Sequence, residues 1–389
     1  MELEEIGDEE TLSGAALAVV LLGAIEAHRL HIKRQKAKRL YLCCPQLLRD
    51  PRGATPWQVL YRSRNDRAYI TTMGFDVTTF HAILDAGFDY AWNTTPIPRD
   101  DAVGTGETRP GARSLDASGA LGLLLHYLNS TMREISLQQI FALIPTTISR
   151  YITFGLNILL TVLRGMSAAA IDWPRHLDHF RAYNDLIVAS HSRLTGVFAS
   201  IDGLNLACQT SDDEEIENAT YNGWLCEHFV SSVLVFSPKG FYLVADTAFP
   251  RGTKQIEGKI KAPIKSGQRM RGTIDEIQAR LAFDRELLSY RQTAEWGMCS
   301  LQGSFGRLRI PLEIGRQTER GDLLEICVRL NKVRAELVGI NQICTVYMPL
   351  WKQTRDEEEI WANFENMLFS EQRRSDRVTT LQFTSQWIS

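Results

Sequence analysis

Apolar residues in the first half of the chain recur at the spacing expected for helices. Residues 12 to 40 begin rich in alanine and leucine and end basic, which predicts a helix. Another helix is predicted over residues 115 to 128, because Leu121, Leu124 and Leu128 fall on one face. Between them, prolines divide residues 43 to 101 into short pieces, and residues 101 to 111 have the composition of a loop. The pattern therefore predicts an all-helical N-terminal half.

A short helix, a tight turn and a longer helix are predicted after residue 135. Ser136 and Gln139 have the spacing of a capping box, and Ile144 with Pro145 ends the short helix. This order is typical of a helix-turn-helix, in which the first residues of the last helix contact base edges. An ordinary segment of a helical bundle is the alternative, since the turn contains no glycine. The residues predicted to contact DNA are Thr146, Thr147, Ser149 and Arg150.

From residue 196 the pattern changes to that of strands. Three apolar runs, VFASID, HFVSSVLVFS and FYLVAD, read as strands, and the turn-forming residues 237 to 240 join the last two. The outer two runs end in Asp202 and Asp246. A long helix is predicted next, opened by a capping box of Thr273 and Glu276 and carrying Glu295 near its far end. Residues 323 to 343 predict one more helix, followed by an acidic amphipathic segment.

Three carboxylates stand at positions where a metal site is expected. Asp202 and Asp246 end strands, and Glu295 projects from the long helix. Carboxylate oxygens suit Mg²⁺ or Mn²⁺, and two such ions can hold the attacking and leaving oxygens of a phosphodiester. Simpler interpretations stay open: Asp202 before glycine is a plain turn, Asp246 caps a helix, and Glu295 pairs with Arg291.

Charge is distributed unevenly, although the net charge is only −3. In residues 251 to 271, seven basic residues against one acid give a local charge of +6 beside Asp246. Such a loop is expected to contact the phosphate backbone of DNA. The residues of this stretch predicted to bind DNA are Lys259, Lys261, Lys265, Arg269 and Arg271. A second basic run, residues 29 to 39, predicts a nuclear address, a phosphate-contacting patch or a solvated helix face.

Cysteine usage and hydropathy limit the remaining classes. Seven scattered cysteines without a CxxC pair argue against a disulfide framework or a zinc site and favour a reducing compartment. The apolar run from Ala15 to Ile25 spans 11 residues, whereas a bilayer needs about 20, so no membrane role is expected. No GxGxxG, Walker-type or GxSxG motif is present, which leaves a dehydrogenase, kinase or serine hydrolase without support.

Several segments together resemble a known family. SIDGLNL, FYLVADTAFPRGT, IKAPIKSGQR and LLSYRQTAEWGMCSLQGSFGRLRIPL resemble the fungal branch of the PIF/Harbinger transposases, which are DDE superfamily endonucleases. RSLDASGALGLLLHYLNSTM and SLQQIFALIPTTISRYI resemble the helix-turn-helix region of the same proteins. The resemblance covers about residues 40 to 380.

The resemblance implies an RNase H-like catalytic core that cleaves DNA strands with bound divalent metal. Asp202 in IDG, Asp246 in VADTAF and Glu295 in RQTAEWG match the DDE triad. Relatives carry a further strand and a helix between the strand ending in FSP and FYLVAD. Here SPKG runs directly into FYLVAD, so the core lacks about one strand and one helix, and the tight turn favours an antiparallel hairpin.

The chain is therefore expected to be α/β with an all-α N-terminal half. The expected parts are a helical segment (1–40), a helical domain (41–195) with the helix-turn-helix at about 115–165, a DDE nuclease domain (196–345) and a helical tail (346–389). The resemblance further implies a nuclear protein that binds DNA and a Myb-like protein partner. Self-association as a homo-oligomer is left open. The alternative function is a catalytically inactive, domesticated or decayed transposase that acts only as a DNA- or protein-binding module.

Overall fold

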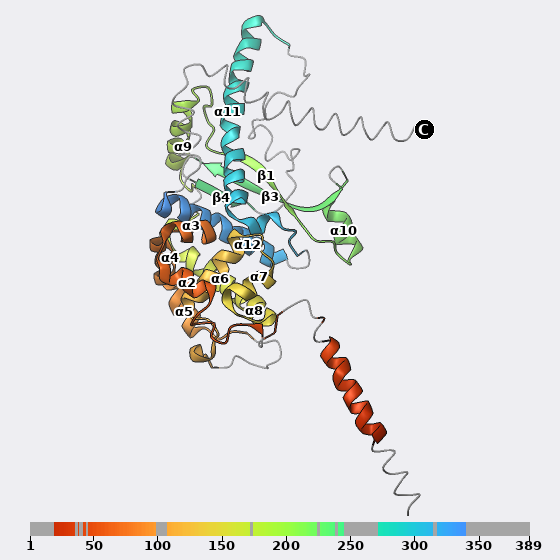
Figure 1. Ribbon diagram of the computed structural model, residues 1–389. Helices are drawn as coiled ribbons and strands as arrows, with labels where there is room; N and C mark the ends of the chain where they lie inside the picture. Colours follow the sequence, from red (N-terminus) through yellow and green to blue (C-terminus); the bar gives the residue numbers. More distant parts are fainter. Residues whose placement is uncertain are drawn as a thin grey trace, which may run out of the picture. The chain divides into compact units, whose positions relative to one another are not determined.

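The computed structural model describes residues 19–35, 38, 42–43, 46–98, 107–171, 174–223, 226–237, 240–244, 271–313 and 317–339. The described residues are mostly helical and contain one small four-stranded sheet, which confirms the mixed α/β class (Figure 1). Residues 19 to 35 form a helix whose residues are all exposed. Residues 1 to 18 and the predicted tail (346–389) lie outside the described residues.

The chain forms two compact units, and each is discontinuous in sequence. The helical unit comprises the described residues up to Ala170 together with Asn205–Val230 and Ser304–Leu330. The second unit comprises Ile171–Leu204 and the described residues within Ser231–Gly303 and from Asn331 onward. The helical unit therefore includes two segments that the sequence places in the nuclease domain.

Short helices open the helical unit, as the prolines between residues 43 and 101 predict. Polar side chains cap three of them. Each of these side chains accepts a hydrogen bond from a backbone N–H three residues later: Thr55 from Gln58, Asn65 from Ala68 and Asp76 from Thr79. The elements are α2 (Pro56–Ser63), α3 (Asp66–Met73), α4 (Val77–Ile83), the π-helix η2 (Leu84–Phe88) and α5 (Asp89–Thr94).

The buried helix α6 (Ala117–Asn129) forms the centre of this unit. Asp116 caps it, and ten of its thirteen residues are buried. Gly122 lets the Trp57 ring approach the helix so closely that an added Cβ would lie 2.2 Å from that ring. The predicted helix at residues 115 to 128 is thus confirmed, with its start two residues later.

Two further helices, α7 (Glu134–Phe141) and α8 (Pro145–Gly165), follow in the predicted order. The predicted capping box at Ser136 is wrong, because α7 begins two residues earlier, after Arg133, without a side-chain cap. Ala142 ends α7 in the left-handed conformation (φ 53°, ψ 43°), a role usually taken by glycine. Residues 142 to 144 therefore form a three-residue turn between the helices.

The helical unit is completed by elements from later in the chain. Gly306 packs against the backbone of Ser130, where an added Cβ would lie 2.8 Å from the carbonyl carbon. Arg307 places its guanidinium 4.3 Å from the ring centre of Tyr127. The elements are the 3₁₀ turns η3 (Pro110–Ala112), η4 (Ser167–Ala169) and η5 (Gly306–Arg309), with α10 (Glu214–Thr220), β2 (Tyr221–Asn222) and α12 (Gln317–Val333).

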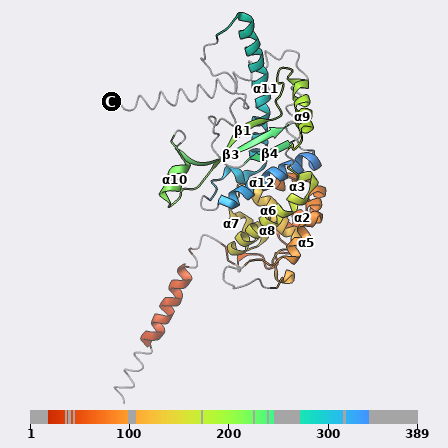
Figure 2. The same ribbon diagram turned by 180° about the vertical axis from the view of Figure 1, so that it is seen from behind.

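The second unit combines helices with most of the sheet. Its elements are α9 (Leu177–Ser190), β4 (Gly240–Val244), nearly all of α11 (Ile274–Ser304) and the π-helix η6 (Arg334–Val338). It also includes the first part of β1 (Ser200–Ala207) and the last part of β3 (Glu227–Ser237). Ile187 of α9 packs with Leu287 and Tyr290 of α11, and Figure 2 shows these two helices side by side. Tyr183 of α9 also packs on Val235 of β3. Helix α9 was not predicted.

The sheet confirms the predicted tight hairpin. β3 and β4 pair antiparallel, with Val233 opposite Val244 and Ser237 opposite Gly240. β3 has β1 as its other neighbour, so β4 does not lie next to β1. At the start of α11 the predicted capping box is present, with Thr273 and Glu276 each donating a backbone N–H to the other's side chain.

Candidate nucleic-acid interface and carboxylate positions

The first two turns of α8 present the residues predicted to contact DNA. Thr146, Ser149 and Arg150 are exposed, and Thr147 is half-buried. Ile148 between them is buried, as expected for a helix whose other side packs on a core. The structure therefore brings three of the four predicted residues onto one open surface.

The exposed polar side of α8 continues beyond the predicted residues. Thr153 and Asn157 are also exposed and lie three or four residues apart from Ser149 and from each other. We define the reading surface as Thr146, Ser149, Arg150, Thr153 and Asn157. The sequence contained a signal for the last two, because they are polar residues at helical spacing within an apolar helix.

Contacts on the buried side of α8 hold its N-terminal half in place. The Tyr151 hydroxyl accepts a hydrogen bond of 2.8 Å from the Ser114 backbone N–H. The Tyr151 ring meets Trp92 edge-on, with ring centres 5.3 Å apart. The orientation of the reading surface is therefore set by the core of the helical unit.

The apolar side of α8 accounts for its membrane-like composition. Among the described helices, α8 alone is long and apolar enough, by length and composition, to cross a membrane. Ten of its residues are buried inside the helical unit. Its hydropathy is therefore explained by packing in the core.

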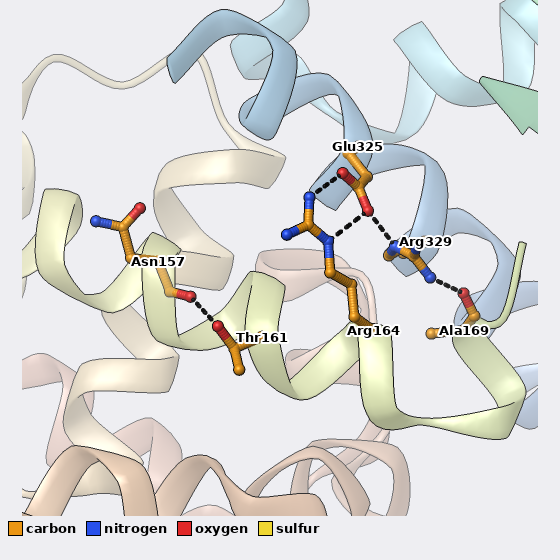
Figure 3. A network of polar contacts seen from close by, with 6 residues as sticks. All are labelled: Asn157, Thr161, Arg164, Ala169, Glu325 and Arg329. Atoms are coloured by element: carbon orange, nitrogen blue, oxygen red, sulfur yellow. Dashed lines mark hydrogen bonds and ion pairs between the residues drawn. The ribbon is translucent and has the colours of Figure 1, made fainter. Parts of the chain in front are cut away.

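A network of charged side chains holds the C-terminal end of α8 (Figure 3). Arg164 donates two hydrogen bonds to Glu325 of α12, at 2.9 Å and 2.5 Å. Arg329 donates to the same carboxylate at 2.8 Å and to the Ala169 carbonyl at 3.0 Å. The hydrogen bonds from Arg164 lower the pKa of Glu325, against the opposing effect of burial, and raise the pKa of Arg164.

Asp202 lies on the inward side of β1. Burial alternates along this strand, and Asp202 shares its side with Ser200, Leu204 and Leu206. Its Oδ1 accepts a hydrogen bond of 2.9 Å from the Gly203 backbone N–H. Asp202 is thus a half-buried carboxylate on the side of the sheet that faces the interior.

Glu295 projects from a different side of α11. The Oγ of Ser200 lies 3.3 Å from the Oγ1 of Thr293, so it is Thr293 that faces β1. Two residues of helix turn the chain by about 200°. Glu295 therefore points away from β1, with 44% of its side chain exposed and its Oε1 4.0 Å from Arg291. This pairing is the simpler interpretation of Glu295 that the sequence left open.

The other predicted site residues fall at or beyond the edges of the described residues. Asp246, Lys259, Lys261, Lys265 and Arg269 lie outside them. Arg271 is described and exposed. The strand that precedes Asp246, β4, is two strands away from β1, a separation of about 10 Å.

Within the described residues, no group of three histidine, cysteine, aspartate or glutamate side chains is placed to hold a metal ion. Comparison of the chain with models of protein families, with curated proteins and with solved structures finds no match.

Proposed function

We propose that this chain is a transposase-derived protein of the PIF/Harbinger type whose function is to bind double-stranded DNA through α7 and α8. The observation that carries the proposal is the reading surface, an exposed polar face on a helix that follows a three-residue turn. The resemblance of residues 115 to 165 to the helix-turn-helix region of these transposases supports it.

The chemistry of the reading surface suits a DNA groove. The major groove of B-DNA admits one α-helix, and hydroxyl, amide and guanidinium groups are the side chains that contact base edges there. Arg150 is the one cation of the reading surface, so we expect this surface to contribute about one phosphate contact to the salt dependence of the affinity.

Binding of a fluorescent random-sequence duplex to the full chain tests the proposal. We expect Arg150→Ala to weaken binding and to reduce the slope of log affinity against log salt by about one. Arg67→Ala is the matched control, because Arg67 is an exposed arginine of the same unit on α3. Equal effects of the two changes, or no binding by the wild-type chain, would contradict the proposal.

A metal-dependent DNA nuclease with an RNase H-like core is the second candidate. The position of Asp202 on the inward side of β1 favours it, together with the match of Asp202, Asp246 and Glu295 to the DDE triad. Bound Mg²⁺ or Mn²⁺ would supply activated water and stabilise the leaving oxygen. Against it, Glu295 turns away from β1, and β3 separates β4 from β1. Metal-dependent nicking of plasmid DNA that is lost in Asp202→Asn would establish this function.

Nuclear location, a Myb-like partner and homo-oligomerisation are further parts of the proposal. Exposed Arg29, Lys33 and Arg34 on the helix of residues 19 to 35 support a nuclear address. Replacing these three residues by glutamine in a fluorescent fusion is expected to shift the protein from the nucleus to the cytoplasm.

A further inference from the structure

The reading surface extends for more than two turns beyond the first residues of α8. From Ser149 to Asn157 the helix rises by about 12 Å. Successive base pairs are about 3.4 Å apart, so this length corresponds to between three and four base pairs. A helix aligned with the groove would therefore place Asn157 over a different base pair from Ser149 and Arg150.

The carboxamide of Asn157 is not engaged by any described residue. Thr161 donates its hydroxyl to the backbone carbonyl of Asn157 at 3.0 Å, which leaves the side-chain amide open (Figure 3). A free carboxamide offers a donor and an acceptor side by side. This pair matches the N7 acceptor and N6 donor of adenine in the major groove.

The same network shows where the reading surface ends. Arg164 follows Thr161 on this side of the helix. Its Nε and Nη2 atoms both donate hydrogen bonds to the Glu325 carboxylate. The charge of Arg164 is thereby offset within the protein. Asn157 is consequently the last side chain on this side of α8 that is exposed, polar and free of a partner among the described residues.

We infer that Asn157 is a specificity-determining residue that binds the N6 and N7 edge of one adenine, with Thr153 packed against the neighbouring base pair. The inference rests on the proposed DNA binding by α7 and α8. It adds the kind of base that is recognised and its position, three to four base pairs from the bases near Ser149.

Selection of preferred sequences from a random duplex library, using the full chain, identifies the bound motif. The decisive quantity is the ratio of affinity for the selected duplex to affinity for the duplex with one adenine replaced. We expect this ratio to fall about 5- to 150-fold in Asn157→Ala at one position of the motif. Thr161→Ala is the matched control, since Thr161 is exposed one turn further on and its hydroxyl is already bonded. Its ratio is expected to equal that of the wild type.

A modified base separates direct recognition from an indirect effect on folding. Replacing the recognised adenine by 7-deazaadenine removes the N7 acceptor, so the wild-type chain should lose affinity and Asn157→Ala should not respond. If the wild type selects a motif and Asn157→Ala keeps the same ratio at every position, the inference is wrong and the proposed function stands. If the wild type selects no motif and does not bind DNA, both are wrong.

Discussion

The side-chain oxygens of Ser200 and Thr293 lie 3.3 Å apart and join the first residue of β1 to α11. This contact places Thr293 on the side of α11 that faces the strand. Glu295, two residues later, is then directed about 200° away, toward Arg291. The side of α11 that faces the first residue of β1 therefore carries Thr293, whereas Glu295 lies on another side of the helix.

Replacing Glu295 is therefore expected to leave metal binding unchanged. In calorimetry with Mn²⁺, any heat of binding shown by the wild-type chain should persist in Glu295→Gln, because Glu295 lies on a different side of α11 from Thr293, which faces β1. Arg291→Gln serves as the control for loss of the Glu295 ion pair. Micromolar binding that is abolished by Asp202→Asn and also by Glu295→Gln would contradict this prediction. It would show that both carboxylates bind the metal and would support the nuclease function.

Loss of Arg329 should destabilise the helical unit more than loss of Arg164. Arg329 is largely buried and bonds both Glu325 and the Ala169 carbonyl, whereas 53% of the Arg164 side chain is exposed. We expect Arg329→Ala to lower the free energy of unfolding by about 2–3 kcal/mol and Arg164→Ala by at most about 1 kcal/mol. Urea unfolding measures both, and equal losses would contradict this order.

Acid should weaken the same network. The pKa of Glu325 is lowered in the folded protein, mainly by the hydrogen bonds from Arg164, so its stabilising contribution is present above the pKa of an unfolded glutamate. That contribution is lost as the pH falls through the folded value. Comparing the unfolding free energy of the wild type and Glu325→Gln as the pH is lowered should show the two curves converging.

His126 should give a separate loss of stability at mildly acidic pH. Burial among Trp57 and Phe141 lowers the pKa of this imidazole from 6.5 to about 4, although a hydrogen bond to the Gly122 carbonyl opposes the shift. Between these two values the unfolded chain binds a proton that the folded chain does not. Stability should therefore fall by on the order of 3 kcal/mol as the pH decreases from 6.5 to 4.

Urea unfolding followed by tryptophan fluorescence measures this dependence. His126→Leu should have a flatter dependence on pH over the same range, because it lacks the titrating group. An unchanged slope in that variant would assign the acid sensitivity to other residues.

Replacing Ala142 by glycine should stabilise the protein. Its left-handed backbone conformation at the end of α7 is unfavourable for a residue with a Cβ, so Ala142→Gly should raise the unfolding free energy by about 0.5–1 kcal/mol. Ala120→Gly, in the interior of α6, should instead lower it, by about 1 kcal/mol or more. Thermal unfolding of the two variants distinguishes these opposite signs.

Local sequence signals identified several elements because short-range physics determines them. The capping box of Thr273 and Glu276 and the antiparallel β3–β4 hairpin are formed by residues close in sequence. The capping box at Ser136 failed because the backbone of Arg133 already provides the start of α7. A turn without glycine argues against a helix-turn-helix, yet Ala142 adopts the left-handed conformation that glycine usually supplies.

Long-range packing could not be predicted in the same way. The direction of Glu295 depends on the contact between Ser200 and Thr293, which are 93 residues apart. The return of residues 304 to 330 to the helical unit depends on contacts such as Arg164 with Glu325, which are 161 residues apart. No local pattern of apolar and polar positions contains either relationship.

The contribution of α12 to the helical unit joins two segments that lie far apart in the sequence. Leu324, Cys327 and Leu330 of α12 are buried, and Glu325 holds the end of α8. A shortened transcript that stopped near residue 195 would encode α7 and α8 but would leave their supporting charge network and part of their core untranslated. The helical unit that presents the reading surface therefore needs residues as far as 330, beyond segments that resemble a nuclease.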